Sequence, residues 1–204
     1  MKITPEDLPL TGYTLLDKLD HANIIPFVKI YYQKKTRATI IYRIIKLILV
    51  LTILVFFMEY YYSGKFNPFA IAHFFYGFIL ALMLLPLHEY IHVLAFRSMG
   101  AKKTSVRVNF KTLVILAIAD KFVVNRKEFQ VALLAPFVLI TLLLLVSSLF
   151  IVKFWIPVIL GTLLFHTYSC KADMSLLSYL EFHKEKEIAV YDDEAASVIY
   201  FYAR

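Results

Sequence analysis

Residues 85–94 read LPLHEYIHVL and place the pattern His-Glu-x-x-His inside a long apolar run. On an α-helix, His88 and His92 lie one turn apart on the same face. Two imidazoles at this spacing can bind one zinc ion, and Glu89 beside them can accept a proton from a zinc-bound water. The plain alternative is a pair of buried, hydrogen-bonded histidines with a glutamate that faces water. Because ionisable groups in membrane helices are costly and usually functional, we favour the metal site.

The composition indicates a membrane protein with one domain. Of the 204 residues, 60% are hydrophobic and 18% are charged, which is more apolar than a soluble domain. In such a protein the formal net charge of +7 reports membrane topology, so we expect no nucleic acid as a partner. The single cysteine, Cys170, excludes an internal disulfide. The N-terminal residues lack the compact apolar core of a cleavable signal peptide.

Four apolar runs predict about four transmembrane helices, at residues 44–62, 69–96, 129–150 and 154–171. Pro86 lies in the second run, just before the histidine pair, and should kink that helix. The predicted fold class is therefore an all-α multi-pass membrane protein. Its expected organisation is an N-terminal segment, residues 1–43, a membrane domain, residues 44–173 with a basic loop at 97–127, and a tail, residues 174–204.

Several shorter elements are expected outside the spans. Residues 14–20 could form a short amphipathic helix on the membrane surface. Residues 105–111 alternate apolar and polar side chains and predict a β-strand, which residues 112–119 could pair with as a small interfacial hairpin. Residues 187–191 and 198–202 predict two short C-terminal strands.

The distribution of lysine and arginine predicts the orientation in the membrane. These residues gather in the N-terminal flank and in the loop 97–127, whereas the turns at the other end carry only Lys65 and Lys153. Cytoplasmic loops carry the excess of basic residues in membrane proteins. We therefore expect an integral protein in the lipid bilayer with both termini in the cytoplasm.

A zinc hydrolase needs a third protein ligand besides His88 and His92. Candidates gather near the end of the fourth run, where His166, Cys170 and Asp173 share one helix face. At 1.5 Å per residue, His88 and Asp173 both lie roughly 28 Å from the outer ends of their spans, and His166 lies about 10 Å higher. Asp173 is therefore the predicted third ligand, with His166 and Cys170 as its near neighbours. Two alternatives stay open, namely that Asp173 only ends its helix in water and that Cys170 is a small buried hydrophobe.

Further segments carry a resemblance to a known family. After the histidine motif come RSMGAKK at residues 97–103, RKEF at 126–129, LAP at 134–136 and CKAD at 170–173. From about residue 70 onward the chain resembles the zincin peptidase family, a group of small bacterial membrane proteins. More distantly it is similar to the site-2 proteases, intramembrane metalloproteases with an aspartate ligand two spans after the His-Glu-x-x-His helix. Ala172 and Met174 flank Asp173 here, where site-2 proteases usually carry Asn-Pro before Asp-Gly.

The resemblance implies a membrane-embedded zinc endopeptidase in the bacterial plasma membrane. Its substrate would be a membrane-associated protein or peptide, cut near the cytoplasmic face. Zn²⁺ would be held by His88, His92 and Asp173, and Glu89 would activate the zinc-bound water.

The strand at 105–111 could clamp an extended substrate by edge pairing through Val106, Val108 and Phe110. The alternative is a plain hairpin on the membrane surface. Two rival functions stay open for the whole chain. One is a catalytically inactive membrane scaffold that binds a partner and holds no stoichiometric metal. The other is a small transporter, for which we would expect inverted repeats that the sequence lacks.

Overall fold

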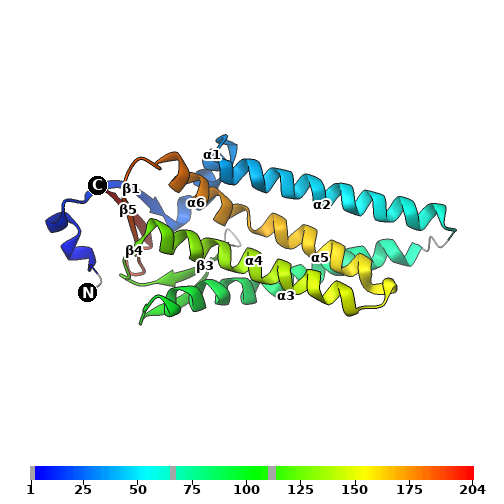
Figure 1. The fold of residues 1–204 in the computed structure, drawn as a ribbon. Helices are drawn as coiled ribbons and strands as arrows, with labels where there is room; N and C mark the ends of the chain where they lie inside the picture. The colour runs from blue at the N-terminus through cyan, green and yellow to red at the C-terminus, as the bar shows by residue number, and fades with distance from the viewer. Residues whose placement is uncertain (1–2, 65–67, 110–113) are drawn as a thin grey trace.

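The structure is a computed structural model that describes residues 3–64, 68–109 and 114–204. It is an elongated bundle of helices with a small β-region at one end, where both termini lie (Figure 1). The helices are α1 (Ile24–Gln33), α2 (Arg37–Tyr62), α3 (Pro68–Ser98), α4 (Arg126–Phe150), α5 (Ile156–Ser169) and α6 (Lys171–Phe182). Short 3₁₀ turns lie at Pro5–Asp7, Pro9–Thr11, His21–Asn23 and Lys153–Trp155.

Within the described ranges, three helices, α2, α3 and α4, are long and apolar enough to cross a membrane. They correspond to the first three predicted spans. The fourth predicted span is also helical, but α5 has 14 residues, and a bilayer needs roughly 20. The chain bends at Cys170, where the backbone ψ rises to 7°, before α6 continues. By length and composition, three of the four predicted spans are therefore candidate membrane-spanning helices.

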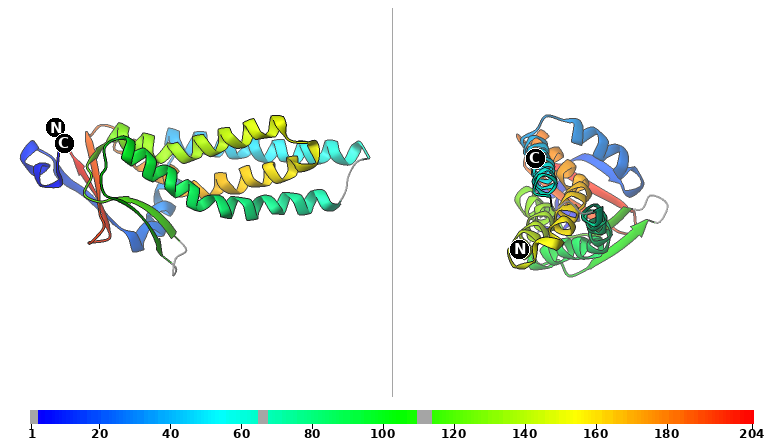
Figure 2. Two further views of the ribbon diagram at one scale, coloured as in Figure 1. Left: turned by 90° about the horizontal axis from the view of Figure 1, so that it is seen from below. Right: turned by 90° about the vertical axis from the view of Figure 1, so that its right-hand side faces the viewer.

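The strands form two sheets (Figure 2). The larger sheet is antiparallel in the order β1-β6-β5-β4, with β1 (Thr14–Asp20), β4 (Val124–Asn125), β5 (Ile188–Asp193) and β6 (Val198–Ala203). The smaller one is the antiparallel hairpin of β2 (Thr104–Asn109) and β3 (Val114–Ala119). A bridge between Asp120 and Asp192 joins the end of β3 to β5. The predicted hairpin and the two predicted C-terminal strands are confirmed.

The helix predicted at residues 14–20 is wrong, because this segment is strand β1 and pairs with β6. The register between the two strands shifts from Leu15 to Asp17, which marks a β-bulge. The bulge interrupts the usual alternation of faces. Leu16 and Leu19, three residues apart, therefore both pack on the core, and their spacing imitates that of a helix. Pairing with β6 decides the outcome over local propensity.

Two glycines bring α3 and α5 into close contact. A Cβ atom added to Gly77 would lie 2.4 Å from the Val158 carbonyl oxygen, and one added to Gly161 would lie 2.1 Å from the Phe74 oxygen. Small residues at such crossings let the two backbones approach each other closely. The crossing therefore fixes the height of α5, and of the α6 residues that follow it, relative to α3.

Arg126 ties the start of α4 to the end of α6. Its guanidinium donates hydrogen bonds to the carbonyl oxygens of Leu180, His183 and Lys186. The Leu180 and His183 carbonyls belong to the end of α6, where intrahelical donors run out and a positive charge is favourable, and the Lys186 carbonyl lies in the turn that follows. Asn125 caps α4 itself by accepting a hydrogen bond from the Glu128 amide at 3.0 Å. Together these contacts set the position of α6 beneath the sheet.

Candidate metal centre

Two histidines of α3 and one aspartate of α6 meet inside the protein. His88 Nε2 lies 3.2 Å from Asp173 Oδ2, and His92 Nε2 lies 3.3 Å from Asp173 Oδ1. The two Nε2 atoms are 3.2 Å apart. All three side chains are buried. The structure thus brings together the three residues that the motif and the depth count singled out, and Asp173 does not end its helix in water.

These separations fit a metal centre better than direct hydrogen bonds. Ligands about 2.0–2.1 Å from a tetrahedral zinc ion lie roughly 3.3 Å from one another. A charge-assisted hydrogen bond between imidazole and carboxylate would be shorter, at about 2.7–2.9 Å. Two imidazole nitrogens and one carboxylate oxygen also form a donor set that zinc accepts, with a fourth position left for water. The residues present therefore fit a zinc ion.

The His92 ring is oriented by the backbone of α4. Its Nδ1 atom donates a hydrogen bond to the Ala132 carbonyl oxygen at 2.8 Å, and Ala132 is fully buried. With the proton on Nδ1, the lone pair of Nε2 points toward Asp173 and His88, as a metal ligand requires. Sequence reasoning missed this carbonyl, since a backbone group leaves no mark in the sequence.

Glu89 is half-buried and contacts the hairpin. Its Oε2 atom accepts a hydrogen bond of 3.0 Å from the backbone amide of Ala117 in β3. The amide of Asp120, three residues further along, donates to the Lys103 carbonyl oxygen at the other edge of this strand. Because amides alternate between the two edges of a strand, the Ala117 amide lies on the edge facing α3. Glu89 therefore sits beside the candidate ligands and against a strand edge.

The strand that borders the site is β3 rather than β2. Ile115, Leu116 and Ala117 of β3 line the cavity beside the metal centre. Val106 and Val108 of β2 are outside that lining, with 45% and 42% of their surfaces exposed. Phe110, the third residue of the predicted clamp, lies outside the described residues. The structure does not bring the predicted clamp residues of β2 to the site.

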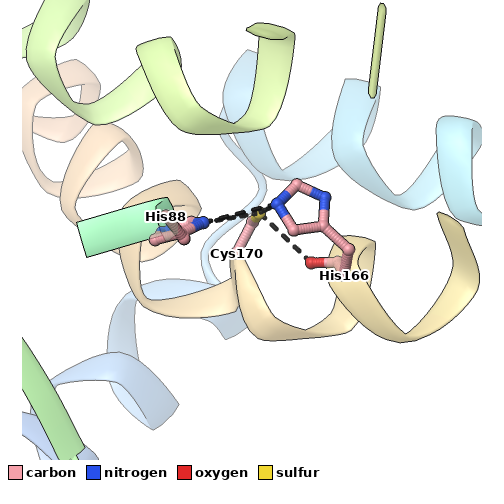
Figure 3. Close-up of side chains that lie close together, drawn as sticks. All are labelled: His88, His166 and Cys170. Carbon is pink, nitrogen blue, oxygen red and sulfur yellow. Dashed lines mark hydrogen bonds between the residues drawn. The ribbon is translucent and has the colours of Figure 1, made fainter. Parts of the chain in front are cut away.

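His166 and Cys170 lie behind His88 (Figure 3). His88 Nδ1 is 3.4 Å from His166 Nε2 and 4.0 Å from Cys170 Sγ, and the last two atoms are 3.8 Å apart. All three residues are buried. The two sequence-predicted neighbours therefore contact the ring nitrogen of His88 that faces away from Asp173.

The candidate centre opens into a cavity of about 340 Å³. Its polar wall is formed by His88, Glu89, His92 and Asp173. Ser169, Tyr191 and Asp192 also line it, and the apolar lining includes side chains of α1, β3, α4 and the larger sheet: Ile24, Phe27, Leu116, Leu133, Val190 and Ile199. This volume is in the range of small ligand sites, and it could hold a few side chains of an extended peptide.

Asp192 lies at the sheet side of this cavity and marks a feature that sequence reasoning missed. Its Oδ1 atom is 3.1 Å from His21 Nε2. Burial raises the pKa of the Asp192 carboxyl, while the contact with His21 opposes the rise. His21 had no assigned role in the sequence, because nothing there indicates that it meets a residue near the other end of the chain.

Most residues of the candidate centre lie in a segment that matches a known protein family. A family model described as putative zincin peptidase matches residues 81–188, which is more than half of the chain and includes His88, Glu89, His92 and Asp173. No curated protein and no solved structure matches the chain. The more distant likeness to site-2 proteases stays a prediction. The resemblance to the zincin peptidases is confirmed, and the chain belongs to the putative zincin peptidase family.

Proposed function

We propose that this protein is a zinc-dependent, membrane-embedded endopeptidase that cleaves a membrane-associated protein or peptide near the cytoplasmic face. One observation carries the proposal. His88, His92 and Asp173 converge from two helices at separations that suit tetrahedral zinc, with Glu89 next to them on a cavity wall. Family membership supports it, since the family is described as zincin peptidases.

Each residue of the candidate centre would have its own role in the proposed reaction. When bound, zinc would lower the pKa of a coordinated water and polarise a carbonyl. Glu89 would take the proton from the attacking water and deliver it to the leaving amine. Its contact with the Ala117 amide holds the carboxylate at the strand edge, where a substrate carbonyl can approach. The buried Ala132 carbonyl would keep the His92 ring in its ligand orientation.

A peptide bond must be exposed before it can be cut, and a helix hides its amides. The edge of β3 that carries the Ala117 amide faces α3, and β3 residues line the cavity. We therefore propose that an extended substrate segment pairs with β3 by strand addition, in place of the clamp on β2. The apolar cavity walls would accept its hydrophobic side chains.

Metal content tests the ligand assignment. Purified wild-type protein should hold stoichiometric zinc, and His92→Ala and Asp173→Ala should each lose metal at the His88–His92–Asp173 centre. Glu89→Gln is the matched control, because it alters a neighbouring buried polar residue that is not a ligand and should keep the metal. A wild-type protein without stoichiometric metal would refute the proposal and favour a scaffold that binds a membrane partner.

Cleavage tests the role of Glu89. The protein and a membrane-protein extract would be reconstituted together in liposomes, and new peptide N-termini would be identified by mass spectrometry. Wild type should generate N-termini that Glu89→Gln does not, although both hold metal. Equal cleavage by the two proteins would show that the proposed mechanism is wrong.

A further inference from the structure

We propose that His88 Nδ1, His166 Nε2 and Cys170 Sγ form a second, thiolate-containing metal position. It shares the His88 ring with the proposed zinc centre but uses the opposite ring nitrogen (Figure 3). His166 and Cys170 are one helical turn apart, at the junction of α5 and α6, so both face α3. This proposal is linked to the proposed peptidase only through the shared His88 ring. The second metal position could exist even if the protein cleaved no peptide.

The separations match the edges of a tetrahedral metal site. Two nitrogen ligands of zinc lie roughly 3.3 Å apart, and a nitrogen and a sulfur ligand lie about 3.6 Å apart. The observed distances are 3.4 Å between the two nitrogens and 3.8 and 4.0 Å from the sulfur to each nitrogen. A hydrogen bond between the two rings would normally bring the nitrogens closer, to within about 3.2 Å.

The surroundings of His88 also favour a second metal over simple support of the first. A metal-bound histidine usually donates its other N–H to a carboxylate, a carbonyl or water. Among the described residues, His88 Nδ1 faces only an imidazole and a thiol. His166 is 1% exposed, and within the described ranges its Nδ1 has no hydrogen-bond partner, so this buried ring makes its polar contacts there through Nε2.

The donor set defines the class of metal. Two imidazole nitrogens and one thiolate suit Zn²⁺, and also Co²⁺ or Cu(I), rather than Mg²⁺ or Ca²⁺. The Cys170 thiol donates a hydrogen bond to the His166 carbonyl oxygen, with 3.2 Å between sulfur and oxygen. Metal binding would release this thiol proton and the Nδ1 proton of His88. With both positions filled, the His88 ring would be a bridging imidazolate. Thiolate and imidazolate together would match the charge of a divalent ion in this buried place.

Cobalt titration of the metal-free full-length protein tests the proposal. Cobalt bound by a thiolate gives an intense sulfur-to-metal charge-transfer absorption, and cobalt bound by nitrogen and oxygen does not. Wild type should bind two equivalents and show this absorption. Cys170→Ala should bind one equivalent without it. Asp173→Ala is the reciprocal variant, since it should lose the first position and keep the absorption.

The two proposals can fail separately. One equivalent in wild type without the charge-transfer absorption would overturn the second position and leave the peptidase centre standing. Loss of all binding in Asp173→Ala, with no absorption in any protein, would also overturn it. X-ray absorption spectroscopy of wild-type zinc protein gives a measurement that needs no variant. It should show a sulfur neighbour at about 2.3 Å, and its absence would contradict the assignment.

Discussion

A single backbone amide holds the carboxylate of Glu89. The amide belongs to Ala117, and its edge of β3 is free of the partner strand β2. A side chain that must move a proton needs both the right group and a fixed place, and a misplacement of about 1 Å can cost 10²-fold in rate. The contact therefore makes the hairpin a part of the proposed catalytic apparatus.

Replacing Ala117 with proline tests this contact. Proline lacks the amide hydrogen but is tolerated at strand edges, so pairing with β2 should survive. We expect Ala117→Pro to lower cleavage by about 10²-fold while metal content stays unchanged. Ile115→Pro is the matched control, because its amide lies on the same edge two residues away and meets no carboxylate among the described residues. An equal loss in the two variants would mean that the β3 edge as a whole, through substrate pairing or hairpin stability, matters rather than the Glu89 contact.

At the scale of single residues, the sequence predicted which side chains come together in the candidate centre but not their backbone partners. His88, Glu89 and His92 follow from the motif, and Asp173 follows from a count of helical rise. The Ala132 carbonyl and the Ala117 amide could not be found in this way, because every residue carries such groups. Only the tertiary arrangement decides which of them meets His92 or Glu89.

Among the secondary-structure elements, the crossing of α3 and α5 sets the geometry of the centre. Asp173 comes twelve residues after Gly161, so any shift of α5 at the crossing is passed on toward its carboxylate. We expect Gly161→Ala to lower the free energy of unfolding by about 1–3 kcal/mol, because the added methyl meets backbone atoms. The unfolding temperature and the zinc content of the purified variant should both be lower than those of wild type.

Ile79→Ala is the control for this crossing, since Ile79 is two residues from Gly77 and half-exposed on α3. The substitution removes apolar surface from α3 but leaves the contact between Gly77 and Gly161 unchanged. If Gly161→Ala bound zinc as tightly as Ile79→Ala does, the crossing would not determine the position of Asp173.

Arg126 offers a second test at this scale, at the junction of α4 and α6. Hydrogen bonds from a charged group contribute about 1.5–3 kcal/mol, so Arg126→Gln should clearly lower the unfolding temperature. Arg126→Lys should restore only part of it, because an ammonium group cannot span three carbonyls in the manner of a planar guanidinium. Lys127→Gln, at the exposed neighbouring position, should have little effect. A full rescue by lysine would show that charge alone matters there.

Element prediction from sequence succeeded where the pattern was local and failed where pairing was distant. The apolar runs of α2, α3 and α4 are long enough to identify by themselves, and the hairpin strands adjoin each other in the chain. Strand β1 pairs with a segment close to the other end of the chain, and its bulge hides the alternation that normally marks a strand. The end of the fourth apolar run was predicted to within two residues, but α5 itself has only 14 residues because the run opens with the 3₁₀ turn at Lys153–Trp155.

For the whole molecule, the distribution of charge predicts the orientation in the membrane. The end of the bundle with the termini also carries the sheet and the start of α4, and the α4–α5 turn lies at the other end (Figure 1). We expect Lys153→Cys to react with a membrane-impermeant maleimide in intact cells, and Lys184→Cys to react only after permeabilisation. The fully buried native Cys170 should give little background. The opposite labelling pattern would reverse the orientation and place the proposed centre near the outer face.

The pairing of β1 with β6 has a consequence for biosynthesis. Leu19 of β1 and Ile199 of β6 both border the cavity, and six residues from the first strand are in register with the last one. The cavity wall cannot close until β6 has been synthesised and has paired with β1. A nascent chain already inserted in the bilayer would thus contain α3 with its histidine pair while the cavity wall is still incomplete. The proposed hydrolytic activity would therefore begin only after this last strand has taken its place, well after the histidine helix has entered the bilayer.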